Sequence, residues 1–304
     1  MQWAIRKAPE IEIDSDRYDA LQNARSILIG ALAIEEKYDI LFSNYLELEK
    51  ECLSYATECM VKGSLGYEGF ATARQSINRR IVNLLTSARL YTDHIQQNIK
   101  LCMEEESAFN VKSLMSEQYD NNFSYRFMEA LRNYVQHCGL AIHRVSTPTR
   151  WTSQDDDREL EFGLNVFAEQ NVLKESKKFK AKILKEMPEE VEIIRASRSY
   201  VGSISIVHNV LRGTIKENVS EARKAIQVAI DEYKAVNDGC AIGLKALKYK
   251  KDEFPKDIID DFPILLEWDD SRVELELRNC EIKNLGKRFV SSGAYNKALH
   301  RTSR

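Results

Sequence analysis

Six consecutive residues, 132–137, place three chemically useful side chains within two turns of a predicted helix. They read Arg-Asn-Tyr-Val-Gln-His and include Arg132, Asn133 and His137. A guanidinium binds phosphate oxygens through parallel hydrogen bonds, and an imidazole exchanges protons near neutral pH. Together with an amide, these groups could bind a phosphate and move a proton without a metal ion.

The residues around this motif have the hydrophobic spacing of an amphipathic helix. At about 100° per residue, the apolar positions form one stripe. The stripe consists of Phe127, Leu131 and Val135, with Tyr134 and Cys138 beside them. Asn133 and Gln136 lie near the opposite pole, so the polar side chains are expected to face away from the core.

The two charged groups of the motif cannot meet on one atom from a single helix. Arg132 and His137 are five residues apart, which puts them about 140° apart on the helix surface. Asn133 lies four residues before His137, within reach of the imidazole. A second copy packed across a two-fold axis would bring Arg and His side chains from both chains around one cleft. The geometry therefore predicts a composite site in a homodimer.

This pattern resembles the motif of the HEPN superfamily, a group of helical ribonucleases and ribonuclease-derived modules. Its motif is an arginine, a polar residue, a few further residues and a histidine on a late helix of a small bundle. Arg132, Asn133 and His137 match it position by position. The resemblance covers at most about residues 15–145. Active members of the family are metal-independent endoribonucleases that work as dimers, many of them toxins or phage-defence effectors.

The resemblance implies a role for each residue of the motif. His137 would be the general base or acid for attack of a ribose 2′-hydroxyl on the adjacent phosphate, and Arg132 would stabilise the charge of the phosphorane. Asn133 would orient His137 or bind a phosphate oxygen. A 2′-hydroxyl nucleophile restricts such a reaction to RNA. No metal or other cofactor is expected. A protein partner that neutralises or activates the chain is a further possibility of this interpretation.

A second segment of the chain shows how little the bare spacing means. Arg89 and His94 have the same separation as the motif arginine and histidine, but Leu90 stands where the motif has asparagine. We expect these two residues to be solvated, or to line the same cleft if their helix packs against the motif helix. Several cations and one amide are candidates for RNA contact: Arg89, His94, Arg126, Gln136, Arg144 and, in the predicted hairpin, Arg150.

The composition indicates a helical globular protein. The 304 residues are 43% hydrophobic and 30% charged, with only 5 Pro and 12 Gly. The formal net charge of −3 gives no electrostatic footprint for general nucleic-acid binding, so RNA would need a local positive cleft. No apolar run is long enough for a membrane span, and a cytoplasmic location is expected. The six cysteines have no paired spacing, which argues against a zinc site.

Helical periodicity dominates the first 140 residues. The predicted elements are a helix from Ser15 or Asp16 to at least Tyr55, a break at 63–69, a helix at 70–102, a short helix at 107–119 and the motif helix capped by Asn122. Several helices of this length indicate a bundle.

The periodicity changes after the motif. Strand-like alternation at 160–166 predicts a β-hairpin with residues 142–151. The remaining predictions are a helix at 168–185, Pro188 in the first turn of the next helix, a long periodic helix within 190–236 that Gly202 or Gly213 could interrupt, a Lys-rich loop at 245–256 and a last helix at 270–290 with strand as the alternative. The fold class is therefore mainly α, a helical bundle with a small β-hairpin insertion after the motif helix.

These predicted elements divide the sequence into two regions. Residues 1–145 are predicted to form a HEPN-like bundle, and residues 146–304 are predicted to form the hairpin and a long-helix region that can pack on the first as one unit. An alternative function is a non-catalytic helical interaction module, favoured if Arg132 and His137 are held in ion pairs within the chain. A third is a nucleic-acid-binding regulator that uses the hairpin and the loop at 245–251.

Overall fold

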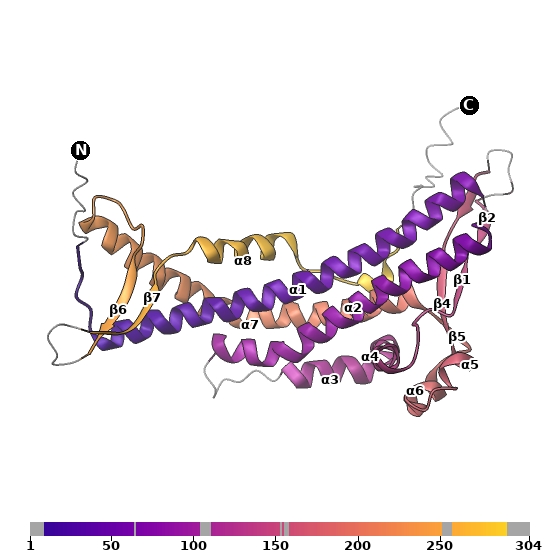
Figure 1. Cartoon of the computed structure of the whole chain (residues 1–304), viewed down its shortest axis with the longest axis horizontal. Helices are drawn as coiled ribbons and strands as arrows, with labels where there is room; N and C mark the ends of the chain where they lie inside the picture. Colours follow the sequence, from indigo (N-terminus) through magenta and orange to yellow (C-terminus); the bar gives the residue numbers. More distant parts are fainter. Residues whose placement is uncertain are drawn as a thin grey trace.

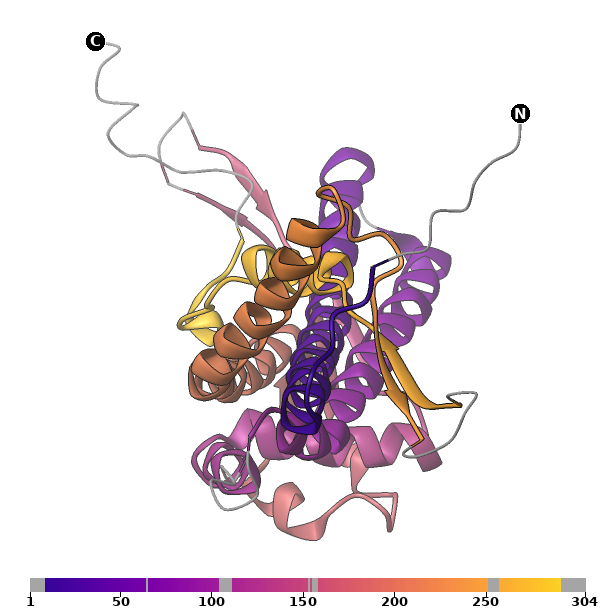
Figure 2. The ribbon, with the colours of Figure 1, turned by 90° about the vertical axis from the view of Figure 1, so that its left-hand side faces the viewer.

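The computed structural model describes residues 9–63, 65–103, 111–152, 154, 158–250 and 257–290. Three long helices run along its long axis (Figure 1): α1 (Ser15–Lys62), α2 (Gly66–Cys102) and α7 (Ile193–Val236). The 48 residues of α1 extend about 72 Å at 1.5 Å per residue. Seen end on, α1 lies between α2 and α7 and packs against both (Figure 2). The chain is therefore mainly helical, as predicted, and its long helices give it an elongated shape.

The first helix begins at a polar cap and ends before a glycine. The N-cap of α1 is Asp14, one residue before the predicted cap, and its carboxylate accepts a hydrogen bond from the Arg17 backbone N–H at 2.8 Å. The helix ends before Gly63, whose φ of 83° suits glycine. The predicted break is confirmed, but it is shorter than expected because α2 already begins at Gly66.

The motif helix lies beside the long helices. α3 (Val111–Asn121) precedes α4 (Phe123–His137), and α4 packs against α7, α2 and α3. Asn122 caps α4 as predicted, since its side chain accepts from the Tyr125 backbone N–H. Its amide nitrogen also donates to Ser199 and Ser203 of α7, each at 2.9 Å. The cap therefore fixes the start of the motif helix on α7. The first residues of the predicted 107–119 helix lie outside the described residues.

The predicted hairpin is present and belongs to a larger β region. β2 (Thr149–Trp151) pairs with β3 (Leu160–Phe162) in antiparallel register. Next to them, β1 (Arg144–Ser146), β4 (Asn165–Glu169) and β5 (Glu190–Glu192) form a three-stranded antiparallel sheet in the order β1-β4-β5.

The predicted helix at 168–185 is wrong for half of its length. Ala168 is buried in β4 opposite Val191, and only the short helices α5 (Gln170–Leu173) and α6 (Ala181–Glu186) follow. The placement of Pro188 in a helical first turn is wrong too, because β5 comes first and α7 starts at Ile193. Pairing between strands far apart in sequence overrides the local periodicity here.

α7 is continuous through both glycines that could have interrupted it. The Glu192 carboxylate caps it by accepting from the backbone N–H groups of Ile194 and Arg195. A glycine in a helix interior costs only about 1 kcal/mol relative to alanine. The buried apolar stripe of this 44-residue helix outweighs that cost at Gly202 and Gly213.

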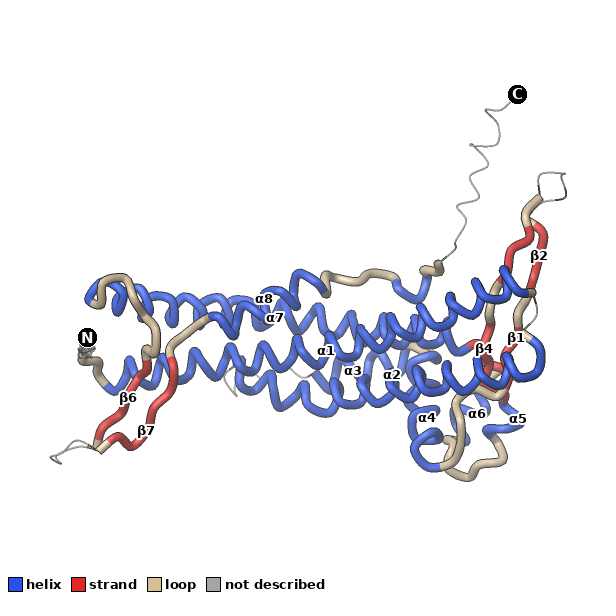
Figure 3. The backbone as a smooth tube through the Cα atoms, turned by 45° about the horizontal axis from the view of Figure 1, so that its top comes forward, coloured by secondary structure: helices blue, strands red, loops and turns tan. Residues whose placement is uncertain are grey.

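A second hairpin replaces part of the predicted Lys-rich loop. β6 (Lys245–Tyr249) pairs with β7 (Ile258–Pro263) at the end of the rod opposite the first sheet (Figure 3). Phe262 of β7 is buried and lies 5.3 Å from the ring of Tyr18, so the hairpin covers the start of α1. The rest of the predicted loop, 251–256, lies outside the described residues.

The last helix is shorter than predicted and begins earlier. α8 (Glu267–Arg278) packs along α1, and a single 3-10 turn, η2 (Leu285–Lys287), packs against α7. Helix, not the alternative strand, forms at 273–277.

One apolar cluster runs through the molecule and includes residues from both sides of residue 145. Examples of its fully buried members are Leu41, Leu84, Phe127, Tyr200 and Leu211. Within the described part of the chain, no helix is both long and apolar enough to cross a membrane.

Candidate functional site

The polar residues of the motif lie on the outer face of α4. Phe127, Leu131 and Tyr134 are buried on the other face, as the periodicity predicts. Gln136 and His137 are exposed at the end of the helix. The motif is therefore presented on the surface of a helix whose apolar face is fixed in the core.

The Arg132 guanidinium is held by amides of its own helix. Its Nη2 donates to Oδ1 of Asn133 at 2.6 Å, and Nη1 approaches Oε1 of Gln136 at 3.5 Å. Its Nε is shielded from solvent and has no hydrogen-bond partner within the described residues. No carboxylate of the described residues forms an ion pair with it, so its positive charge is not neutralised by direct pairing.

The expected contact between Asn133 and His137 is not formed in the single chain. The amide oxygen of Asn133 is taken by Arg132. In the part of the chain that the structure describes, no hydrogen bond or ion pair involves the imidazole of His137. The described contacts thus bring Arg132, Asn133 and Gln136 together and leave His137 exposed to solvent.

The other arginines predicted to contact RNA are paired with carboxylates. Arg126 binds Glu186 at 2.8 Å and donates to two backbone carbonyls at the end of α3. Arg144 pairs with Glu169 and Glu190.

Two further arginines are also neutralised. Arg89 pairs with Asp93 at 2.5 Å on α2, and Arg150 pairs with Glu161 at 2.5 Å across the β2–β3 hairpin. Among the five arginines that the sequence singles out, Arg132 therefore differs from the other four in having no carboxylate partner among the described residues.

The second Arg–His segment lies on a helix that contacts the motif helix. α2 packs against α4, and His94 is exposed on α2. Burial raises the pKa of Tyr125, as does the charge of Glu129, while the positive charge of Arg89 opposes the rise. Arg89 is thus close enough to α4 for its charge to act there.

A carboxylate beside the motif was missed at the sequence level. Glu129 lies three residues before Arg132, and its Oε1 accepts a hydrogen bond of 2.5 Å from the hydroxyl of Tyr200. Tyr200 is fully buried on α7, and its ring lies 5.0 Å from that of Tyr125. The position of Glu129 was visible in the sequence. Its partner, 71 residues away, was not.

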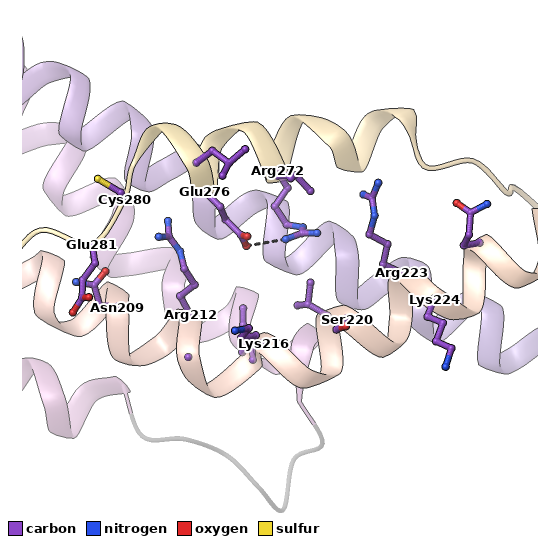
Figure 4. Close-up of a pocket in the computed structure, with 16 residues that line it drawn as sticks. Asn209, Arg212, Lys216, Ser220, Arg223, Lys224, Arg272, Glu276, Cys280 and Glu281 are labelled. Atoms are coloured by element: carbon purple, nitrogen blue, oxygen red, sulfur yellow. Dashed lines mark hydrogen bonds and ion pairs between the residues drawn. The ribbon is translucent and has the colours of Figure 1, made fainter.

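A groove of about 940 Å³ separates α7 from α8 (Figure 4). Most of its cations are already paired. Arg223 bridges to Asp269 and Asp270, and Arg272 binds Asp269 and Glu276. The rest of the lining combines aliphatic side chains, two exposed lysines and polar groups such as Asn209 and Gln227, with no aromatic ring for stacking of a base.

One cation of the groove leads into a buried polar network. Arg212 donates from Nε and Nη2 to the two carboxylate oxygens of Glu35, which is 2% exposed. His208 is fully buried, with Nδ1 at 3.0 Å from the Tyr91 hydroxyl and its ring stacked 3.7 Å from that of Tyr38. Its Nε2 lies 3.4 Å from Glu35 but makes no hydrogen bond within the described residues.

The titration of this network follows from its burial. Burial lowers the pKa of His208 below its ordinary value of 6.5, against the attraction of Glu35. Burial acts to raise the pKa of Glu35, but the adjacent His208 and the two hydrogen bonds and positive charge of Arg212 outweigh burial and lower the pKa. The consistent state is an Arg212–Glu35 ion pair beside a neutral imidazole. These groups are enclosed by α1, α2 and α7, so we assign them to the core.

Within the described residues, no group of three or more His, Cys, Asp or Glu side chains could hold a metal ion. No protein-family model, curated protein or solved structure matches this chain. The features that indicate a function are therefore the motif residues and the side chains that surround them.

Proposed function

We propose that this chain is a metal-independent endoribonuclease of the toxin or phage-defence type, with Arg132, Asn133 and His137 in a composite site of a homodimer. The observation that carries the proposal is the difference between Arg132 and its neighbours. Arg89, Arg126 and Arg144 are paired with carboxylates, whereas among the described residues Arg132 is held only by amides. A guanidinium that is oriented but not paired can accept a phosphate without first losing an ion pair.

The proposed reaction is a transesterification within RNA. His137 of one copy removes the proton of a ribose 2′-hydroxyl, and the oxygen attacks the adjacent phosphorus. Arg132 stabilises the negative charge on the phosphorane oxygens. His137 of the second copy protonates the departing 5′-oxygen, so the products are a 2′,3′-cyclic phosphate and a 5′-hydroxyl. Each of the two imidazoles acts once, which is why the site needs two chains.

The contact between Arg132 and Asn133 supports this role. It uses Nη2 of the guanidinium and leaves the weakly held Nη1 for a phosphate. An arginine whose fork is already oriented loses less side-chain entropy when it binds an oxyanion. Asn133 would then act mainly on the arginine.

The proposal is tested by comparing growth and RNA integrity in a bacterial host that expresses wild type, Arg132→Ala, His137→Ala and His94→Ala. We expect RNA cleavage by wild type and His94→Ala, with losses of about 10²-fold or more in the two motif variants. Purified wild type should cleave RNA in EDTA. Cleavage that survives His137→Ala, or that needs a divalent cation, would contradict the proposal.

A non-catalytic helical interaction module is the second candidate. It is favoured by the pairing of Arg126 and Arg144, which leaves few free cations around the motif in a chain of net charge −3. Identical growth for all four proteins, with no cleavage by purified wild type, would favour this alternative.

A further inference from the structure

Glu129 and Arg132 are three residues apart on α4, the spacing at which a carboxylate and a guanidinium on one helix form an ion pair. Arg89 and Asp93 on α2 show that such intrahelical pairs form in this protein at the neighbouring spacing of four. Glu129 and Arg132 nevertheless do not pair. The absence of this ion pair is explained by a different partner of the Glu129 carboxylate, the hydroxyl of Tyr200.

We propose that Tyr200 is a positioning residue that holds Glu129 away from Arg132 and so keeps the guanidinium available for phosphate. The inference rests on the proposed function of the motif and adds to it a residue of α7 that touches no substrate. The contact that carries it is the 2.5 Å hydrogen bond from the Tyr200 hydroxyl to Oε1 of Glu129.

Tyr200 is suited to this role because packing on all sides holds its side chain in place. Its side chain is fully buried, and its ring packs 5.0 Å from the ring of Tyr125, which belongs to α4 itself. Asn122 adds hydrogen bonds from the start of α4 to Ser199 and Ser203 of α7, on either side of Tyr200 in the sequence. The hydroxyl is therefore fixed relative to the motif helix.

The Glu129 carboxylate can either accept the hydrogen bond from Tyr200 or form an ion pair with Arg132, and the hydrogen bond is the more stable of the two. A hydrogen bond from a buried hydroxyl to a carboxylate is charge-assisted and shielded from water. An ion pair between Glu129 and Arg132 would lie near the surface, where solvent weakens the attraction and both long side chains lose entropy. Removing the Tyr200 hydroxyl reverses the preference, because Arg132 lies within reach three residues on, whereas Arg126, at the same spacing on the other side, is already paired with Glu186.

The decisive experiment measures kcat/KM for RNA cleavage in Tyr200→Phe, Glu129→Gln and the double variant. Tyr200→Phe should lower kcat/KM by about 10²-fold, similar to loss of Arg132 itself. Glu129→Gln alone should stay within about threefold of wild type, and the double variant should recover most of the loss. Removing both partners of a buried hydrogen bond can also restore stability, so thermal unfolding of the three variants is measured beside kcat/KM. Recovery of activity that only follows recovery of stability would overturn the inference.

Tyr38→Phe is the matched control. Tyr38 is also almost fully buried, and its hydroxyl donates to Ser205 at 2.9 Å, away from α4. This variant should lose stability in thermal unfolding but keep its cleavage activity. Equal losses of activity in Tyr38→Phe and Tyr200→Phe would overturn the inference. So would loss of cleavage in Glu129→Gln alone, which would place Glu129 in the chemistry.

A second readout does not depend on cleavage. The Nε–H signal of Arg132, assigned by its absence in Arg132→Ala, can be followed by ¹H–¹⁵N NMR. In Tyr200→Phe it should shift as Glu129 pairs with the guanidinium, and in the double variant it should return. No shift in Tyr200→Phe would overturn the inference even if wild type cleaves RNA. If the Arg132 signal shifts in Tyr200→Phe but the wild type has no ribonuclease activity, the positioning role is supported and the proposed function is rejected.

Discussion

At the scale of single residues, a buried ion pair joins Glu35 of α1 to Arg212 of α7. Glu35 is 2% exposed, and both of its oxygens accept from the guanidinium. Removal of one partner from such a pair leaves an uncompensated charge in the core. A second pair, Arg17 with Glu232, joins the same two helices but lies at the surface. The chain therefore contains its own comparison between buried and exposed pairs.

Glu35→Gln should lower the free energy of unfolding by about 3–5 kcal/mol, because it leaves Arg212 without its counter-ion. Glu232→Gln should change it by less than about 1 kcal/mol, because solvent already screens that pair. Urea unfolding of the two variants beside wild type measures both values. Equal effects of the two substitutions would contradict the assignment of Glu35 to a buried, ionised pair.

The same unfolding experiment has a defined pH dependence. His208 and Glu35 both have pKa values lowered by folding, from 6.5 and 4.5 respectively. The unfolded chain binds more protons than the folded one below each of these values, so stability falls as the pH falls. Wild type should lose stability from pH 6.5 downward, with a further loss below pH 4.5. The loss below pH 4.5 should be smaller in Glu35→Gln.

At the scale of elements, two helical glycines occupy opposite environments. A Cβ on Gly30 of α1 would lie 2.8 Å from Cβ of Leu101 and 2.9 Å from the carbonyl oxygen of Asn98, both on α2. A Cβ on Gly213 of α7 would meet nothing within 4 Å. The first glycine permits close approach of two helices, whereas the second only reduces helix propensity.

Gly30→Ala should therefore destabilise the protein by about 1–3 kcal/mol, since the backbone of α2 must move to admit the methyl group. Gly213→Ala should stabilise it by about 0.5–1 kcal/mol through helix propensity alone. Thermal and urea unfolding of both variants test this pair. Stabilisation by Gly30→Ala would mean that α1 and α2 pack less closely than described.

At the scale of the whole molecule, the sheets formed by β1 to β5 lie at one end of the long helices and the β6–β7 hairpin lies at the other (Figure 3). α4 lies beside the long helices. The outer face of α4 carries Gln136 and His137, and it ends at Cys138, which is also exposed. A composite site requires this face to meet its own copy. Cys138 then provides a marker for the position of the two-fold axis.

We expect the protein to sediment as a dimer at micromolar concentration. A flexible bis-maleimide should join two chains through Cys138, because the proposed composite site requires the motif faces of the two copies to be opposed. Cys138→Ser should abolish the product, whereas Cys240→Ser and Cys280→Ser should not, although both of those thiols are exposed as well. A strictly monomeric protein would exclude the composite site.

The sequence by itself determined the helical class, the cap at Asn122, the buried stripe through Phe127 and Leu131, and the first hairpin. Each of these depends on a period or on a residue type whose preference acts within a few positions along the chain. The same is true of the motif, since Arg132, Asn133 and His137 are close neighbours on one helix. The function that the resemblance implies remains a proposal from those three residues.

Only the tertiary structure decided which of these groups are free to act. The pairing of Ala168 with Val191, the ion pair between Arg126 and Glu186, and the bond between Tyr200 and Glu129 join positions 23, 60 and 71 residues apart. No local period encodes such contacts, because they depend on which helices and strands become neighbours after folding. Burial and distance then fix which charges are neutralised, and in this chain they leave Arg132 without a carboxylate partner among the described residues.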